Sequence, residues 1–230
     1  MLAPDLYGFV IFRCVIGSQA YGLSREVSDT DRRGIYLPPA SLEWSLEGVP
    51  EQIENVETQE CYWEIKKFLL LALKANPNIL ECLYSPIIEH RTEIADSILT
   101  HRRIFLSKLV YQTYSGYAAS QFRRIEQDHR TLGAVNWKHV MHLIRVLLQG
   151  ISILRNGEPA INVGSFREEL LAIRDGLMPW AEITDWRQAL AKDFDTSLEK
   201  SSLPDSPDYN AANRLLVDAR AATAKQYYGS

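Results

Sequence analysis

Two carboxylates near the start of the chain have a spacing that suits metal chemistry. Asp29 and Asp31 stand two residues apart, and on an extended strand this spacing places both side chains on one face. Such a pair can bind Mg²⁺ or Mn²⁺, which take oxygen ligands and leave positions for water and substrate phosphates. A solvated turn rich in Ser and Asp often carries the same pair, so its meaning depends on the residues around it.

A turn of small residues, Gly17-Ser18-Gln19-Ala20-Tyr21-Gly22, precedes the carboxylates. Gly17 and Gly22 lack a Cβ and permit close backbone approach and positive φ. The Ser18 hydroxyl and nearby amides can donate to phosphate oxygens. Residues 10–16 are rich in β-branched and aromatic side chains, which predicts a buried strand that ends at the turn. A strand, a phosphate-binding turn and two carboxylates in this order favour metal-dependent phosphoryl transfer.

These motifs resemble the nucleotidyltransferases of the DNA polymerase β superfamily, whose signature is a hydrophobic residue, Gly-Ser, a spacer and Asp-x-Asp. The longer match over residues 17–36 is similar to the RNA-repair-pathway branch of polymerase-β-like proteins. Two further blocks, residues 62–68 and 73–81, support that branch. The resemblance covers residues 1–100 well and the rest of the chain weakly.

The resemblance implies a reaction and residues for it. Asp29 and Asp31 would ligate the metal ions, and Gly17 and Ser18 would hold the β and γ phosphates of a nucleoside triphosphate. An acceptor hydroxyl would then attack the α phosphate and release pyrophosphate. The sequence does not specify the acceptor. The family label suggests an RNA 3′ end, whereas a protein hydroxyl or a small molecule would need the same catalytic residues.

The third carboxylate that the resemblance implies is missing from its expected place. A gap-free match puts Gln59 where such proteins carry a metal-binding Asp. The substitutes are Glu60, beside that position, and Glu57, on the same strand face as residue 59. Glu60 is favoured as the third catalytic and metal-binding carboxylate. If neither reaches the metal, the alternative function is a catalytically weak or silent nucleotide-binding protein of the same fold.

Length and composition are those of a globular protein without a membrane span. The chain has 230 residues, of which 46% are hydrophobic, enough for one large or two small domains. Its three cysteines are odd in number and lack metal-ligand spacing, which predicts buried thiols rather than disulfides. No apolar run reaches about 20 residues, and the start lacks the features of a signal peptide. We therefore expect a cytoplasmic location and no membrane partner.

The pattern of the chain changes after Pro86. Short strands and one apolar helix, over 62–74, come before it, and segments of helical period follow. The expected fold is α+β: a polymerase-β-like domain with a small mixed sheet, followed by a helical domain. The predicted domains are residues 1–100, which are catalytic, and residues 101–230, which close the nucleotide cleft. The final helix is expected near 209–227.

A row of nitrogen-bearing side chains forms a second candidate site. Lys138, His142 and Arg145 fall at i, i+4 and i+7, so they share a helix face opposite an apolar stripe. The resemblance implies that such a face holds the triphosphate, with Arg145 binding phosphate bidentately and Lys138 acting as a point charge. A solvated helix face explains the row equally well, and His142 can instead be a core histidine with satisfied hydrogen bonds.

Overall fold

The computed structural model describes residues 5–26, 28–133 and 135–228. Contacts between Cα atoms divide the chain into two compact units. The sheet unit comprises residues 1–20, 25–105 and 207–230, and the helical unit comprises residues 21–24 and 106–206. The chain therefore passes from one unit to the other four times. The α+β class predicted from the sequence is confirmed.

A mixed five-stranded sheet forms the centre of the sheet unit, in the order β3-β4-β2-β1-β5. The β2–β4 pair is parallel, and the other neighbouring pairs are antiparallel. The strand before the Gly-Ser turn, β1, pairs with the strand that begins at Asp31, β2. The strands are β1 (Val10–Ile16), β2 (Asp31–Tyr36), β3 (Gln52–Asn55), β4 (Glu60–Glu64) and β5 (Ile87–Arg91).

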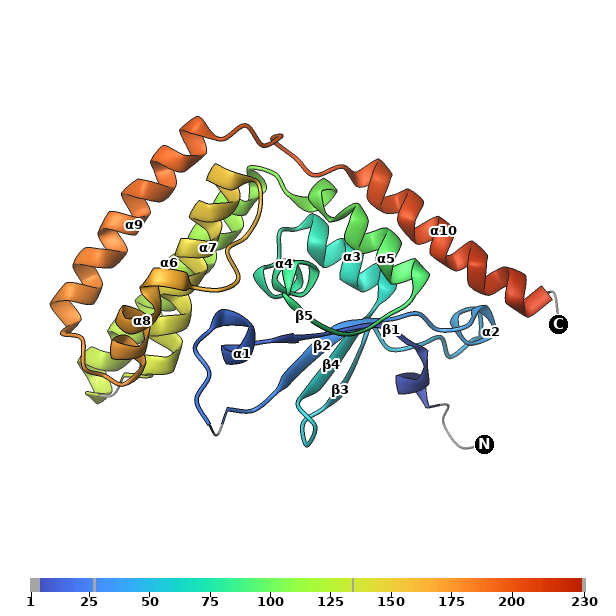
Figure 1. Ribbon diagram of the computed structural model, residues 1–230, viewed down its shortest axis with the longest axis horizontal. Helices are drawn as coiled ribbons and strands as arrows, with labels where there is room; N and C mark the ends of the chain where they lie inside the picture. The colour runs from blue at the N-terminus through green and yellow to red at the C-terminus, as the bar shows by residue number, and fades with distance from the viewer. Residues whose placement is uncertain (1–4, 27, 134, 229–230) are drawn as a thin grey trace. The chain divides into compact units, whose positions relative to one another are not determined.

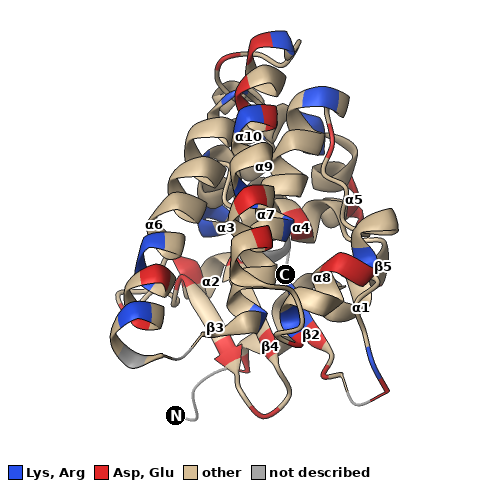
Figure 2. Ribbon diagram, turned by 90° about the vertical axis from the view of Figure 1, so that its left-hand side faces the viewer, with Lys and Arg blue, Asp and Glu red and all other residues tan. Residues whose placement is uncertain are grey.

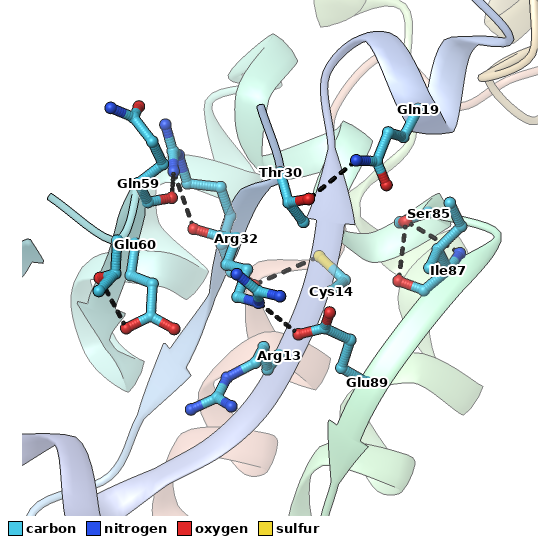
Figure 3. Close-up of polar contacts among 12 residues, drawn as sticks. Arg13, Cys14, Gln19, Thr30, Arg32, Gln59, Glu60, Ser85, Ile87 and Glu89 are labelled. Atoms are coloured by element: carbon cyan, nitrogen blue, oxygen red, sulfur yellow. Dashed lines mark hydrogen bonds and ion pairs between the residues drawn. The ribbon is translucent and has the colours of Figure 1, made fainter. Parts of the chain in front are cut away.

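Helices cover one face of this sheet (Figure 1). Phe12 and Cys14 of β1 are fully buried, and α3, α4 and α5 contact β1 and β2. The opposite face carries charged residues, among them Arg13 and Arg32 (Figure 3). The helices of the unit are α1 (Ser18–Tyr21, of which Tyr21 lies in the helical unit), α2 (Ala40–Glu43), α3 (Ile65–Leu73), α4 (Pro77–Tyr84), α5 (Glu93–Thr100) and α10 (Tyr209–Tyr228), with 3-10 turns η1 (Leu6–Phe9) and η2 (Arg102–Phe105).

The β1–β2 ladder requires a glycine at residue 34. Its register shifts between Val10 and Phe12, and Gly34 is the partner of Arg13. A Cβ built on Gly34 would lie 1.8 Å from the carbonyl oxygen of Phe12. The absence of a side chain at Gly34 also leaves room on the open face, where the Arg13 Nε donates to the Tyr62 hydroxyl at 2.8 Å.

The helix predicted over 62–74 begins later than expected. Residues 60–64 form β4, and α3 starts at Ile65. The Glu64 carboxylate caps α3 by accepting from the Lys67 amide at 3.1 Å. Tyr62 pairs with Gly34 of β2. Tertiary pairing with β2 therefore overrides the helical pattern of this segment.

The helical unit is built around α7, which contacts α6, α8 and α9. Nearly every residue of α7 between 140 and 154 is buried, so this helix has an interior position. Acidic and basic residues are interspersed along α6 (Figure 2), and no all-basic face forms there. The elements of the unit are α6 (Leu109–Leu132), α7 (Trp137–Asn156), the 3-10 turn η3 (Gly164–Phe166), α8 (Arg167–Arg174) and α9 (Trp180–Lys200).

The last helix, α10, returns to the sheet unit. Its Arg220 forms ion pairs with Glu43 and with Glu64, the latter at 3.3 Å. The amide of Asp208 donates to the carbonyl of Ile104 at 2.9 Å. The predicted domain of residues 101–230 includes this helix, whereas its contacts are with α2 and α3 of the sheet unit. Across the described ranges, no helix combines the length and apolar character needed to cross a membrane.

Candidate functional site

The Gly-Ser turn and one carboxylate meet at one end of the β1–β2 ladder. Ile16, the last residue of β1, pairs with Asp31, the first residue of β2. Gly17 follows with φ +76°, and a Cβ built there would lie 2.6 Å from Asp31 Oδ2. The carboxylate therefore occupies space that any other residue at position 17 would fill. The small-residue turn and the carboxylate that follow one another in the sequence therefore lie together at Gly17 and Asp31.

A side-chain hydrogen bond joins the turn to the loop that holds the second carboxylate. Gln19 Nε2 donates to Thr30 Oγ1 at 2.8 Å (Figure 3). Asp29 immediately precedes Thr30 and is exposed, outside the regular strand. The prediction that both carboxylates lie on an extended strand is therefore correct for Asp31 and wrong for Asp29. Sequence reasoning did not identify the Gln19–Thr30 link, because a Gln in a turn has no distinctive spacing.

The arginines after the carboxylates bind groups of the sheet unit itself. Arg32 Nε bonds to Glu89 Oε2 at 2.8 Å. Arg33 Nη2 lies 3.6 Å from Asp31 Oδ1, and its Nη1 donates to the carbonyl of Gln59 at 2.9 Å. Arg33 and Asp31 stand two residues apart on β2, so they lie on the same face of the sheet. Arg33 also neutralises part of the charge of Asp31.

Glu60, the predicted third metal ligand, lies on the opposite face of the sheet from Asp31. Glu60 is the register partner of Arg32 in the parallel β2–β4 pair. Successive residues of a strand point to opposite faces, so Arg32 and Glu60 face away from Asp31. The Glu60 carboxylate instead accepts from the Thr58 hydroxyl at 3.1 Å. The structure therefore does not bring Glu60 together with Asp31.

The charge of Glu60 acts on the open face of the sheet. Burial, followed by the charge of Glu60, raises the pKa of Tyr7. Burial is also the main cause that raises the pKa of Tyr62 to about 12, with Glu60 adding to the rise and Arg13 opposing it. Tyr7 packs edge-on against Tyr62, with ring centroids 6.0 Å apart. Glu60 is thus part of the Tyr7–Tyr62–Arg13 cluster and not of the Gly-Ser turn.

The other two positions considered for the third carboxylate, Gln59 and Glu57, lie in the turn between β3 and β4. Gln59 has φ +55°, a left-handed conformation that is uncommon for a residue with a side chain. Its amide donates to the carbonyl of Val56 at 2.9 Å, within the β3–β4 turn. Glu57 is exposed in the same turn, where its amide donates to Asn55 Oδ1 at 2.9 Å. The Gln59 side chain is therefore bonded within the turn, and the Glu57 backbone is fixed by Asn55.

Asp29 and Asp31 fit a metal ion whose remaining ligands are phosphate and water oxygens. Within residues 5–26, 28–133 and 135–228, no three His, Cys, Asp or Glu residues converge on one metal position. Asp29 and Asp31 supply hard oxygen donors, and the Asp31 side chain is 35% exposed beside Gly17. Mg²⁺ commonly binds through one or two carboxylates together with substrate phosphates. Asp29 and Asp31 fit that mode, and among the residues that the structure describes no third carboxylate joins them.

The predicted basic row on α7 is not an exposed face. Lys138 is exposed, His142 is half-buried and Arg145 is only 2% exposed. Arg145 Nη2 lies 3.0 Å from His142 Nδ1, and His142 Nε2 lies 3.4 Å from the Tyr117 hydroxyl. The guanidinium carbon of Arg145 is 3.7 Å from the centroid of the Tyr21 ring. His142 therefore fits the alternative prediction of a histidine with satisfied hydrogen bonds. Because Arg145 is buried and Lys138 is exposed, the two side chains do not form one solvent-facing row.

Comparison with known proteins assigns the chain to a family. The model of the RNA repair pathway DNA polymerase beta family matches residues 8–218. The chain therefore belongs to this family, which confirms the branch expected from the Gly-Ser and Asp-x-Asp motifs. The match also extends through the helical unit and into α10, beyond the residues where the motifs lie.

Two curated proteins are similar to the chain. The uncharacterised protein MJ0002 of Methanocaldococcus jannaschii is 26% identical over 163 residues, which cover 68% of this chain and 65% of that protein. The uncharacterised protein YcgL of Bacillus subtilis is 27% identical over 167 residues, which cover 71% of this chain and 64% of that protein. The chain thus spans less than two thirds of the length of each relative.

Proposed function

We propose that the protein transfers a nucleotide from a nucleoside triphosphate to an acceptor hydroxyl, with an RNA 3′ end as the acceptor. The observation that carries this proposal is the close approach of Gly17 and Asp31 at the end of β1, where a Cβ would lie 2.6 Å from the carboxylate. Membership of the RNA repair pathway DNA polymerase beta family supports both the reaction class and the acceptor.

Each residue of the turn has a defined part in this proposal. Gly17 leaves room for a phosphate beside the Asp31 carboxylate, and the Ser18 hydroxyl donates to a β or γ phosphate oxygen. Asp29 and Asp31 would hold Mg²⁺ or Mn²⁺, which supplies neutralisation of phosphate charge and a lowered pKa of a bound hydroxyl. Arg33 Nη2 lies 3.6 Å from Asp31 Oδ1 and offsets part of its negative charge.

The chemical step needs no covalent bond to the protein. The acceptor hydroxyl oxygen attacks the α phosphorus, and its proton passes to solvent. The bond between the α phosphorus and the bridging oxygen breaks, and pyrophosphate leaves with the bonding electrons. Positioning and charge neutralisation supply the catalysis.

Transfer of labelled nucleotide to RNA, DNA or the protein itself, measured with Mg²⁺ or Mn²⁺, tests this function. We expect Asp29→Asn and Asp31→Asn each to lower the rate at least about 100-fold, because each removes a metal-binding charge. Glu60→Gln is the matched control, since it removes a carboxylate from the opposite face, and its rate should stay near that of the wild type. Equal losses in Asp31→Asn and Glu60→Gln would refute the site.

A second candidate function is nucleotide binding without turnover. The geometry around Gln59 favours it, because Gln59 and Glu60 leave Asp31 without the third carboxylate that the family resemblance implies. Equilibrium dialysis with Mg²⁺ and ATP separates the two functions. Tight binding with no transfer to any acceptor would establish the silent binder, and turnover gained by Gln59→Asp would identify the missing carboxylate as the cause.

A further inference from the structure

A four-residue segment of the signature motif belongs to the helical unit. Residues 21–24 begin within the turn of residues 17–22 and precede the carboxylates. They pack with residues 106–206. The chain on both sides, through residue 20 and from residue 25, lies in the sheet unit. Tyr21 and Leu23 are 9% and 1% exposed, so the segment is an integral part of the helical unit.

Three successive backbone carbonyls of this segment accept hydrogen bonds from the helical unit. The amide of Val163 donates to Tyr21 O at 3.0 Å. On α8, Arg167 Nε donates to Gly22 O at 3.0 Å and Arg174 Nη1 donates to Leu23 O at 2.9 Å. The two arginines are seven residues apart, so one face of α8 presents both. Hydrogen bonds from charged donors to a carbonyl are stronger than those between neutral groups.

Side-chain packing adds to these hydrogen bonds. The Arg145 guanidinium lies over the Tyr21 ring at 3.7 Å, a cation–π contact between two buried groups. Gly22 has φ +74°, and a Cβ built there would lie 2.9 Å from Asn162 Nδ2. Gly22 is therefore a glycine because the backbone conformation and the Asn162 side chain both require it. The positive φ that the sequence analysis allows at Gly22 is therefore present, and the close approach is to Asn162.

We propose that the helical unit positions the Gly17–Ala20 turn by clamping residues 21–24, with Arg167 and Arg174 as positioning residues. Tyr21 is the last residue of α1, whose first residue is Ser18. The four residues form about one helical turn, so an end that is held fixes the other. This inference rests on the proposed function for its effect on nucleotide binding, but the clamp is a property of the protein alone.

Hydrogen exchange of the ligand-free protein tests the clamp without any nucleotide. In a helix that starts at Ser18, the amides of residues 21 and 22 are the first that can donate within the helix, to the carbonyls of residues 17 and 18. In Arg174→Ala, these two amides should exchange at least about tenfold faster, because a charged hydrogen bond that limits local opening is lost. Arg167→Ala is a milder second variant, and Arg174→Lys should restore part of the protection. Arg155→Ala is the matched control, because it removes an ion pair with Asp193 elsewhere in the helical unit.

A glycine pair tests the clamp with every arginine in place. Gly22→Ala adds strain and a clash with Asn162, whereas Gly133→Ala adds similar strain at φ +64° with no atom within 4 Å. Only Gly22→Ala should accelerate exchange of the amides of residues 21 and 22. Unchanged exchange in both Arg174→Ala and Gly22→Ala would overturn the proposal.

Nucleotide titration then tests the consequence of the clamp. If the wild type binds ATP with Mg²⁺, Arg174→Ala should weaken binding at least about tenfold and raise KM more than it lowers kcat. Wild-type affinity in a variant whose turn exchanges faster would also overturn the positioning role. Failure of the wild type to bind nucleotide would refute the proposed function, while the exchange comparison would still decide whether the helical unit holds the turn.

Discussion

Substitution of Gly17 by Ala tests the site at its closest contact. The residue has φ +76°, where a side chain costs about 1–2 kcal/mol. The new Cβ would lie 2.6 Å from Asp31 Oδ2, whereas close carbon–oxygen contacts are about 3.3 Å, so the carboxylate must move by about 0.7 Å. Because Arg33 holds the other carboxylate oxygen, this movement disturbs the pair that would carry the metal.

We expect two separable results for Gly17→Ala. Calorimetry should show a melting temperature lower by about 2–4 °C for each kcal/mol of strain in a chain of this size. Nucleotide affinity with Mg²⁺ should fall at least about tenfold, which corresponds to about 1.4 kcal/mol. Gly48→Ala is the matched control, since Gly48 has φ +63° and no atom within 4 Å of a built Cβ. It should lose similar stability and keep its affinity. The same affinity in both variants would refute the assignment of Gly17 to the phosphate site.

Other substitutions test the fold that supports the site. Gly34→Ala should prevent folding into soluble protein, because its Cβ would lie 1.8 Å from a backbone oxygen, whereas Gly8→Ala meets no atom within 4 Å and should be soluble in the same expression test. Burial raises the pKa of Tyr36 to about 12, so the unfolded chain loses this proton first and the free energy of unfolding should fall between pH 10 and 12 by on the order of 3 kcal/mol. Tyr36→Phe should make that alkaline slope shallower in urea titrations and leave the part that Tyr62 contributes, and an unchanged slope would contradict the assignment. Arg220→Met should lower the free energy of unfolding by about 2 kcal/mol, because it removes the ion pairs with Glu43 and Glu64. Arg91→Met, at an exposed ion pair, should lower it by less than about 1 kcal/mol. Equal losses would show that these ion pairs do not hold α10.

Local patterns were sufficient to predict much of the fold. The β-branched run at residues 10–16 forms β1 with the predicted bounds, and the final helix expected near 209–227 is α10. The Gly-Ser turn meets Asp31 as expected, because a hairpin-like return of the chain pairs the strands on either side. These features depend on side-chain periodicity and backbone conformation, which neighbouring residues determine.

The features that were not predicted depend on partners far away in the sequence. Glu60 was assigned to the metal from its place beside Gln59, but the parallel pairing of β4 with β2 determines its face. Arg145 was assigned to an exposed row, whereas its partner Tyr21 lies in a segment of the chain that no helical pattern links to α7. A register or a buried cation pair is a tertiary property, and local spacing carries no information about it.

The return of α10 to the sheet unit also determines the order in which the two units can be completed during synthesis. Ribosomes add about 5–20 residues per second, so residues 106–206 take roughly 5–20 s to make after the strands have emerged. Throughout that interval the surfaces of α2 and α3 that α10 covers stay open, and Glu43 and Glu64 lack Arg220. The helical unit, whose segment 21–24 is made early, has all its residues once residue 206 emerges. The unit that begins first is therefore the one that is finished last.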